Sequence, residues 1–261
     1  MHAEALLLEM LADGDIGFGL QATGVPPGPR LEAAVGSLRH DPGLLEALLD
    51  DHRLFPAVAG DPHILLKVTP YFHFSVLLRR SRRELRERTF TAEWLGPRRR
   101  VPVFDARKVA AVLEDPARLH YLAELLASFV ALRHPAGLPE GARGPRGPRF
   151  CELRLEDLRR ARDAAVAADR FALDRRLGDV ALFLAGVFPD SAGNAPQLDA
   201  WELESQQSYR LAARGPLARQ SGLEEILEAL ASDLHPARKA LNFVADRFLQ
   251  PLRYNWFLAG A

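Results

Sequence analysis

Hydrophobic residues recur at helical spacing along most of the chain. In residues 70–88, Tyr71, Phe74 and Leu78 lie three and four positions apart, which puts their side chains on one face of a helix. Residues 116–132 are apolar on most sides, which is typical of a central helix surrounded by other elements. The same spacing predicts further helices at about 2–12, 30–39, 42–51, 105–114, 155–167, 171–187, 198–213, 221–234 and 236–250.

Two segments depart from this spacing. Residues 13–29 contain glycine and proline at a density that disfavours a helix, so we expect a loop there. Between residues 89 and 104, apolar and polar positions alternate on both sides of Gly96-Pro97, which predicts a β-hairpin. Pro102 lacks an N–H group, so the second strand is expected at a sheet edge. The predicted fold class is therefore mainly α, a multi-helix bundle of about nine or ten helices with one β-hairpin near 89–104.

Residues 135–149 divide the chain, because 8 of these 15 positions are proline or glycine. This composition disfavours packing and predicts a linker or a loop. It would separate a helical lobe at 1–134, which contains the hairpin, from a C-terminal helical bundle at 150–261. One domain with a long internal loop is the alternative.

Composition excludes few functions. The chain has 261 residues, and its 34 lysines and arginines balance its 34 aspartates and glutamates, so net charge predicts no partner. Apolar residues make up 48% and charged residues 26%, as in ordinary globular proteins rather than fibrous or disordered ones. Only three of the basic residues are lysines. This excess of arginine fits a thermophilic origin and fits compositional drift equally well.

The chain has few features of a secreted or membrane protein. Its single cysteine, Cys151, cannot form an intramolecular disulfide, which favours a reducing compartment. The N-terminus has acidic residues among its leucines and resembles an amphipathic helix rather than a signal peptide. The longest apolar run, 180–188, is about half of the ~20 residues that a membrane span needs. We therefore expect a cytoplasmic protein without a membrane partner.

The strongest local charge imbalance lies in residues 79–100, where nine arginines accompany three glutamates. Four of the arginines share one helical face, and three more lie at or beside the predicted hairpin turn. The candidate polyanion-binding residues are Arg79, Arg82, Arg83, Arg86, Arg98, Arg99 and Arg100. A basic helix followed by a hairpin with a basic tip has the layout of a winged-helix module, in which such side chains contact nucleic-acid phosphates.

Other interpretations of this segment stay open. Arg80 and Glu84 are spaced to form an ion pair along a helix, so the face can be an ordinary solvated one, or it can contact another protein. The first 60 residues have the opposite imbalance, with nine acidic residues and three arginines. This acidic region can neutralise the basic one within the molecule or pattern the surface for self-association. Either role would make the arginines less available to a ligand.

A second candidate site lies in the C-terminal bundle. Arg238, Asn242 and Asp246 recur every four residues, and Tyr209 and Arg210 lie on another predicted helix. If the two rows face each other, they form a polar pocket for a small anion. An exposed helix face explains the first row equally well. The sequence thus leaves two function classes, a polyanion-binding or regulatory module and, alternatively, a ligand-binding protein or enzyme with a C-terminal pocket.

Motifs for catalysis or cofactors are missing from the sequence. His120 and Glu124 share a helix face, but a catalytic metal needs at least three protein ligands, and mutual hydrogen bonding of buried groups is the simpler account. Asp179 follows Arg175 by one helical turn in an apolar segment, which favours a buried ion pair. No phosphate-binding loop, dinucleotide fingerprint or nucleophile elbow is present. We therefore predict no metal and no cofactor, the sequence identifies no catalytic residue and leaves open whether the protein is an enzyme, and the expected partners are nucleic acid, another polyanion, a protein or a second copy.

Overall fold

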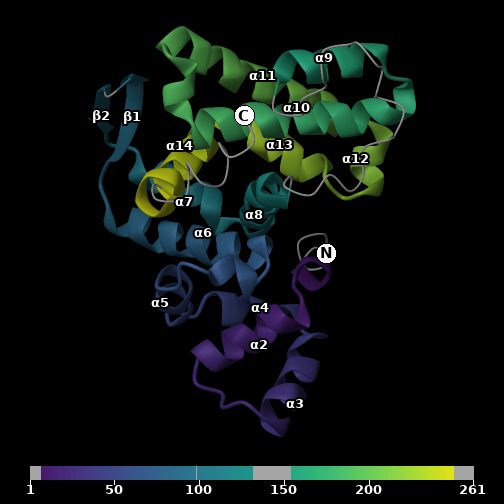
Figure 1. Ribbon diagram of the computed structural model, residues 1–261. Coiled ribbons are helices and arrows are strands. Elements are labelled where there is room, and N and C mark those ends of the chain that lie inside the picture. Colours follow the sequence, from purple (N-terminus) through teal and green to yellow (C-terminus); the bar gives the residue numbers. More distant parts are fainter. Residues whose placement is uncertain (1–6, 98, 132–153, 250–261) are drawn as a thin grey trace. The chain divides into compact units, whose positions relative to one another are not determined.

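The computed structural model describes residues 7–97, 99–131 and 154–249 (Figure 1). These residues form α-helices and one two-stranded antiparallel hairpin, so the predicted fold class is confirmed. Several short helices, such as α5 (Leu54–Ala59) and α12 (Pro216–Gln220), add to those that the sequence predicted. None of the described helices combines the length and the apolar character needed to cross a bilayer.

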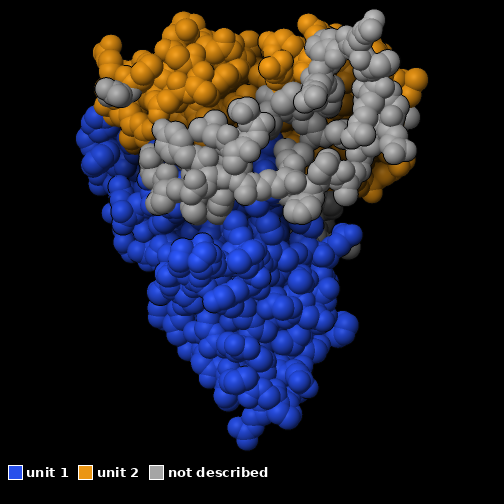
Figure 2. Space-filling model, in the orientation of Figure 1, with its two compact units in different colours: residues 1–91, 102–130, 243–261 blue, residues 92–101, 131–242 orange. Residues whose placement is uncertain are grey.

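The chain forms two compact units, which Figure 2 shows in different colours. Unit 1 contains residues 1–91, 102–130 and 243–261, and unit 2 contains residues 92–101 and 131–242. The hairpin residues 92–101 thus belong to the same unit as the C-terminal helices. The linker predicted at 135–149 lies outside the described residues.

Unit 1 is built around α6, whose side chains Phe72, Phe74 and Leu78 are fully buried. Asp41 and Thr69 accept hydrogen bonds from Leu44 N and Phe72 N at 3.1 and 3.2 Å, and a proline follows each of them, so the two helix starts are fixed by sequence. The helices of this unit are α2 (Asp13–Ala22), α3 (Pro29–Leu38), α4 (Pro42–Leu49), α5 (Leu54–Ala59), α6 (Pro70–Glu87), α7 (Ala106–Glu114) and α8 (Pro116–Ala131).

The loop expected at 13–29 was wrong in its first half, where α2 forms. Asp15 accepts a hydrogen bond from Ala12 N at 2.9 Å at the helix start, and it also accepts bonds from the N–H and hydroxyl of Thr69 at 2.7 and 2.8 Å. A Cβ on Gly19 would lie 3.1 Å from Leu48, so this glycine permits close packing with α4. Tertiary contacts therefore outweigh the low helix propensity of glycine.

Unit 2 is built around α10, which lies beside α9 and α11 (Figure 1). A Cβ on Gly178 would lie 2.7 Å from the ring of Tyr209 in α11, and a Cβ on Gly186 would lie 2.6 Å from Leu241 in α14. The two glycines therefore allow α11 and α14 to approach α10 closely. The helices of this unit are α9 (Leu155–Ala164), α10 (Ala167–Val187), α11 (Ala195–Ala213), α12 (Pro216–Gln220), α13 (Glu224–Ser232) and most of α14 (Leu234–Val244).

The hairpin consists of β1 (Thr91–Gly96) and β2 (Arg99–Val103). Its turn begins at Gly96, whose φ of 145° is strained for any residue with a side chain. Along β1 the buried residues include Thr91 and Trp94, whereas β2 is exposed from Arg99 to Pro102. The hairpin therefore presents one strand to the protein and the other to solvent.

Candidate functional site

The arginine face predicted on α6 is covered by carboxylates of unit 1. Arg79 is only 1% exposed and forms ion pairs with Glu46 and Asp50, the latter at 3.2 Å from its Nε. Asp50 also pairs with Arg82 at 2.7 Å, and its backbone carbonyl accepts a hydrogen bond from Arg83 at 2.8 Å. These contacts direct three of the candidate arginines toward α4 and its C-terminal end.

The remaining arginines near this face are also paired. Arg86 forms an ion pair with Glu114 at the end of α7. Arg80 lies 2.8 Å from Glu84, the spacing along α6 that the sequence suggested. Glu46 and Asp50 come from the acidic first 60 residues, so that region neutralises part of the basic face within unit 1. The face is thus occupied by internal ion pairs.

Glu46 also joins a buried histidine. One of its carboxylate oxygens accepts a hydrogen bond from His120 Nε2, and His120 Nδ1 accepts one from the Tyr71 hydroxyl at 2.5 Å. Burial lowers the pKa of His120, although its bond to Glu46 opposes this shift. Burial would raise the pKa of Glu46, but the bond from His120 and the charge of Arg79 lower it to about 2. We therefore assign a neutral imidazole and a charged carboxylate.

This network links α4, α6 and α8. Tyr71 and His120 are fully buried, so no solute reaches them without local opening. The arrangement resembles a catalytic relay in its residue types, but its Tyr71 and His120 side chains are enclosed by protein. Its role is to fix three helices together.

A second ionic network, in unit 2, anchors the inner strand of the hairpin to α14. Glu93 of β1 pairs with Arg238, with Lys239 at 3.1 Å and with His235 at 3.2 Å. Arg238 and Lys239 are buried, and His235 also lies 3.2 Å from Glu202 of α11. Glu202 in turn pairs with Arg238. Three cations thereby hold Glu93 of the strand in place, and Glu202 pairs with two of them.

Hydrogen bonding sets the charge of this network. The bonds of His235 to Glu202 and Glu93 raise its pKa to about 9, so the imidazole is charged at neutral pH. Burial would raise the pKa of Glu93, but the bond from His235 and the charges of Arg238 and Lys239 hold it well below its usual range. His235 and Glu93 therefore carry opposite charges near pH 7.

Trp94 provides an apolar anchor beside this ionic one. Its ring packs against Ala185, Ala192 and Leu198, and its indole N–H donates to Asp190 at 2.7 Å. Glu93 and Trp94 are neighbours on β1, so successive residues fix the strand by charge and by packing. The hairpin is thus held rigidly on the helices of unit 2.

The outer strand carries the other predicted arginines. Arg99 and Arg100 are exposed on β2 and are followed by exposed Val101. Arg98 lies outside the described residues, as does Cys151. Of the candidate polyanion contacts that the structure describes, these two lie on the solvent side of the hairpin, whereas the α6 arginines are turned toward unit 1 carboxylates.

The residues of the predicted C-terminal pocket do not all meet. Arg238 donates to Asn242 Oδ1 at 2.7 Å, so this pair is buried together. Tyr209 instead donates to Asp179 at 2.9 Å, and Asp179 lies 3.8 Å from Arg175, the pairing that the sequence favoured. Arg210 is exposed on α11.

Asp246, the last residue of that row, belongs to unit 1 in the π-helical turn Ala245–Leu249. The regular spacing of the row therefore does not by itself form one site.

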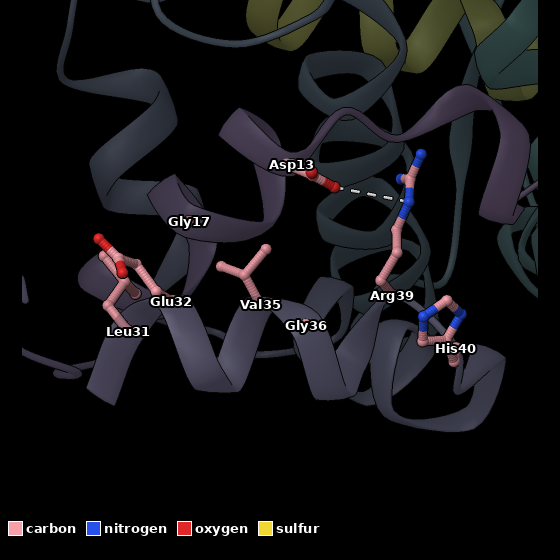
Figure 3. A pocket seen from close by; sticks show the side chains of 8 residues that line it. All are labelled: Asp13, Gly17, Leu31, Glu32, Val35, Gly36, Arg39 and His40. Atoms are coloured by element: carbon pink, nitrogen blue, oxygen red, sulfur yellow. Dashed lines mark ion pairs between the residues drawn. The ribbon is translucent and has the colours of Figure 1, made fainter. Parts of the chain in front are cut away.

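An open hollow of about 490 Å³ lies instead between α2 and α3 of unit 1 (Figure 3). Gly17 of α2 and Val35 and Gly36 of α3 line it, and Asp13 pairs with Arg39 at 3.5 Å beside it. α3 has no buried residue, so the hollow is a shallow groove under an exposed helix. Asp13 and Arg39 neutralise each other there, and Glu32 adds a further carboxylate to the lining.

Sequence reasoning missed the anchor of the hairpin. His235, Arg238 and Lys239 occupy positions i, i+3 and i+4, which places three cations on one helix face. That signal was available, but its partners Glu93 and Glu202 lie far away in sequence. Among the described residues, no group of three or more His, Cys, Asp or Glu side chains is placed to hold a metal ion.

Comparison with known proteins gives no match, whether with family models, curated proteins or solved structures.

Proposed function

We propose that this protein is a binding module that contacts a polyanion, such as a nucleic-acid backbone, with the outer strand of its hairpin. The supporting observation is the contrast between the two strands of the hairpin. Glu93 and Trp94 of β1 are fixed by buried contacts, whereas Arg99 and Arg100 of β2 are exposed. A fixed strand lowers the entropy lost when its cations bind a ligand.

The chemistry of β2 favours phosphate or sulfate groups. Arginine presents a planar fork of donors that matches these anions, and exposed cations can contact a charged backbone without reading sequence. Because the guanidinium groups lie at the strand edge, they can reach an extended chain. Pro102 and the adjacent positive charges also discourage pairing of β2 with a second strand.

Self-association through this edge is disfavoured by the same charges. Two copies paired along β2 would bring Arg99 and Arg100 close to their counterparts, and like charges opposite one another destabilise a sheet. A polyanion therefore fits the strand better than a second copy.

The test is the binding of a fluorescent 20-base-pair duplex followed by anisotropy at 50 and 200 mM salt. With two or three phosphate contacts, affinity should fall by about 10- to 40-fold over this range. Arg99→Ala with Arg100→Ala should weaken binding and flatten the salt dependence while leaving the melting temperature unchanged.

A control double variant removes the same charge elsewhere in unit 2. Arg210→Ala with Arg214→Ala changes two exposed arginines at the end of α11. It should retain most of the affinity. Equal losses in both double variants, or no binding at micromolar protein in 50 mM salt, would refute the proposal.

A further inference from the structure

Two phenylalanines of unit 1 are exposed at the open end of the hairpin. Phe104 follows β2 and is 83% exposed, and Phe90 precedes β1 and is 47% exposed. Their ring centroids lie 6.4 Å apart at an interplanar angle of 71°. By contrast, Phe72 and Phe74 of α6 are fully buried. A pair of exposed aromatic rings is unusual on a soluble surface and often marks a contact site.

The backbone around this aromatic pair is fixed. The Thr91 hydroxyl donates to the Asp105 carboxylate at 2.6 Å, which ties the residue after Phe90 to the residue after Phe104. Asp105 N also donates to Val103 O at 2.9 Å. The rings are therefore presented from a closed turn of chain rather than from a loose loop, and less conformational entropy is lost when a flat ligand stacks on them.

Cations lie directly beside the aromatic pair in sequence. Arg107 and Lys108 are exposed in the first turn of α7, which begins at Ala106. The helix dipole disfavours positive charge at this end, so the charges of these two residues do not stabilise α7 through its dipole. Exposed rings next to such cations complement a ligand that has both flat apolar surfaces and negative charge.

We infer that Phe90, Phe104, Arg107 and Lys108 form a stacking site for the bases of a single-stranded nucleic acid. This inference rests on the proposed function and narrows its ligand. Among linear polyanions, a single-stranded nucleic acid also offers accessible aromatic faces, whereas a duplex keeps its bases stacked inside. Bases stack on Phe104 and Phe90, and Arg107 and Lys108 pair with phosphates. The contact tolerates any sequence, because every base has an aromatic face.

The test compares two labelled 20-mers with equal backbone charge, oligo-dT and an abasic strand without bases, by anisotropy at 50 mM salt. Stacking of one base or more should make oligo-dT bind about 10-fold tighter than the abasic strand. Phe104→Ala should remove this preference and leave abasic binding unchanged, whereas Phe104→Trp should retain it. Leu66→Ala is the matched control, since Leu66 is 86% exposed in the same unit.

Each alternative gives a different result. Equal affinity for the two 20-mers, with binding still dependent on Arg99 and Arg100, would overturn the stacking site and leave the proposed function standing. If neither 20-mer binds, both the stacking site and the proposed function are refuted. Binding to vesicles with 30% phosphatidylglycerol that Phe104→Ala abolishes, without a preference for oligo-dT, would assign the rings to a membrane surface instead.

Discussion

His120 in unit 1 and His235 in unit 2 each lie against glutamate, yet they differ in charge. His120 is fully buried between Tyr71 and Glu46, and burial lowers its pKa. The His235 side chain is 53% exposed and contacts two carboxylates, which raise its pKa to about 9. The amount of water around the imidazole and the number of carboxylates thus decide its charge.

The two networks also differ in what they leave accessible. In unit 1, Glu46 and Asp50 turn Arg79 and Arg82 away from a ligand. In unit 2, Glu93 forms ion pairs with cations of α14, and Arg99 and Arg100 of the opposite strand are exposed. A run of arginines therefore shows where charge is concentrated in sequence, but the fold shows which of these side chains are buried against carboxylates and which are exposed.

The largest effect should follow removal of Glu46. Glu46→Ala leaves Arg79 buried without one of its carboxylate partners and removes the bond to His120. We expect a loss of about 3 kcal/mol in the free energy of unfolding, measured by urea titration. Glu32→Ala, which removes an exposed carboxylate of α3, should change stability by less than ~0.5 kcal/mol. A small loss for both variants would show that the unit 1 network contributes little.

Glu93→Gln should destabilise unit 2 by a somewhat smaller amount, about 2 kcal/mol, because Glu202 still pairs with Arg238 and His235. It should also weaken polyanion binding, because the hairpin loses its ionic anchor although the variant still contains Arg99 and Arg100. Thermal melting and anisotropy together test this. A stable variant with unchanged affinity would show that the anchor is unnecessary for binding.

The two histidines should give opposite pH dependences. The folded-state pKa of His235 is raised from 6.5 to about 9. Its contribution to the free energy of unfolding is therefore fully present below pH 6.5 and is lost as pH rises through 9. The pKa of His120 is lowered, so its contribution is present above pH 6.5 and is lost as pH falls.

Urea titrations from pH 7 to 10 isolate the effect of His235 on stability. The wild-type protein should lose more stability over this range than His235→Gln. Parallel curves for the two proteins would show that His235 is not charged in the folded state.

The smallest effect should come from Arg86→Ala. Arg86 pairs with Glu114 where both side chains are substantially exposed, and surface pairs contribute at most about 1 kcal/mol. The midpoint of thermal unfolding should therefore move little. A loss as large as that of Glu46→Ala would contradict the distinction between buried and exposed pairs on α6.

Much of the fold followed from local sequence. The helices predicted at 42–51 and 70–88 and the hairpin turn predicted at Gly96-Pro97 all form, because the cap residues, prolines and glycine that fix them act within a few residues. The glycine-rich segment of α2 was missed because its helix depends on Leu48 and Thr69, which are distant in sequence. Local propensity cannot include such contacts.

The candidate site was harder to locate for the same reason. The spacing of Arg79, Arg82 and Arg86 correctly placed them on α6, but their carboxylate partners lie about thirty residues away in the chain. The ion pair of Asp179 with Arg175 was easier to predict, since both residues lie on one helix. Pairings within a helix can be predicted from spacing, whereas pairings between helices need the fold.

The most direct test of the account compares two double variants of equal charge change. Arg99→Ala with Arg100→Ala alters the outer strand of the hairpin, and Arg82→Ala with Arg83→Ala alters the α6 face. Titration of the labelled duplex at 50 mM salt should show a large loss of affinity for the hairpin variant and near wild-type affinity for the α6 variant. The reverse pattern would place the binding surface on α6 and contradict the account.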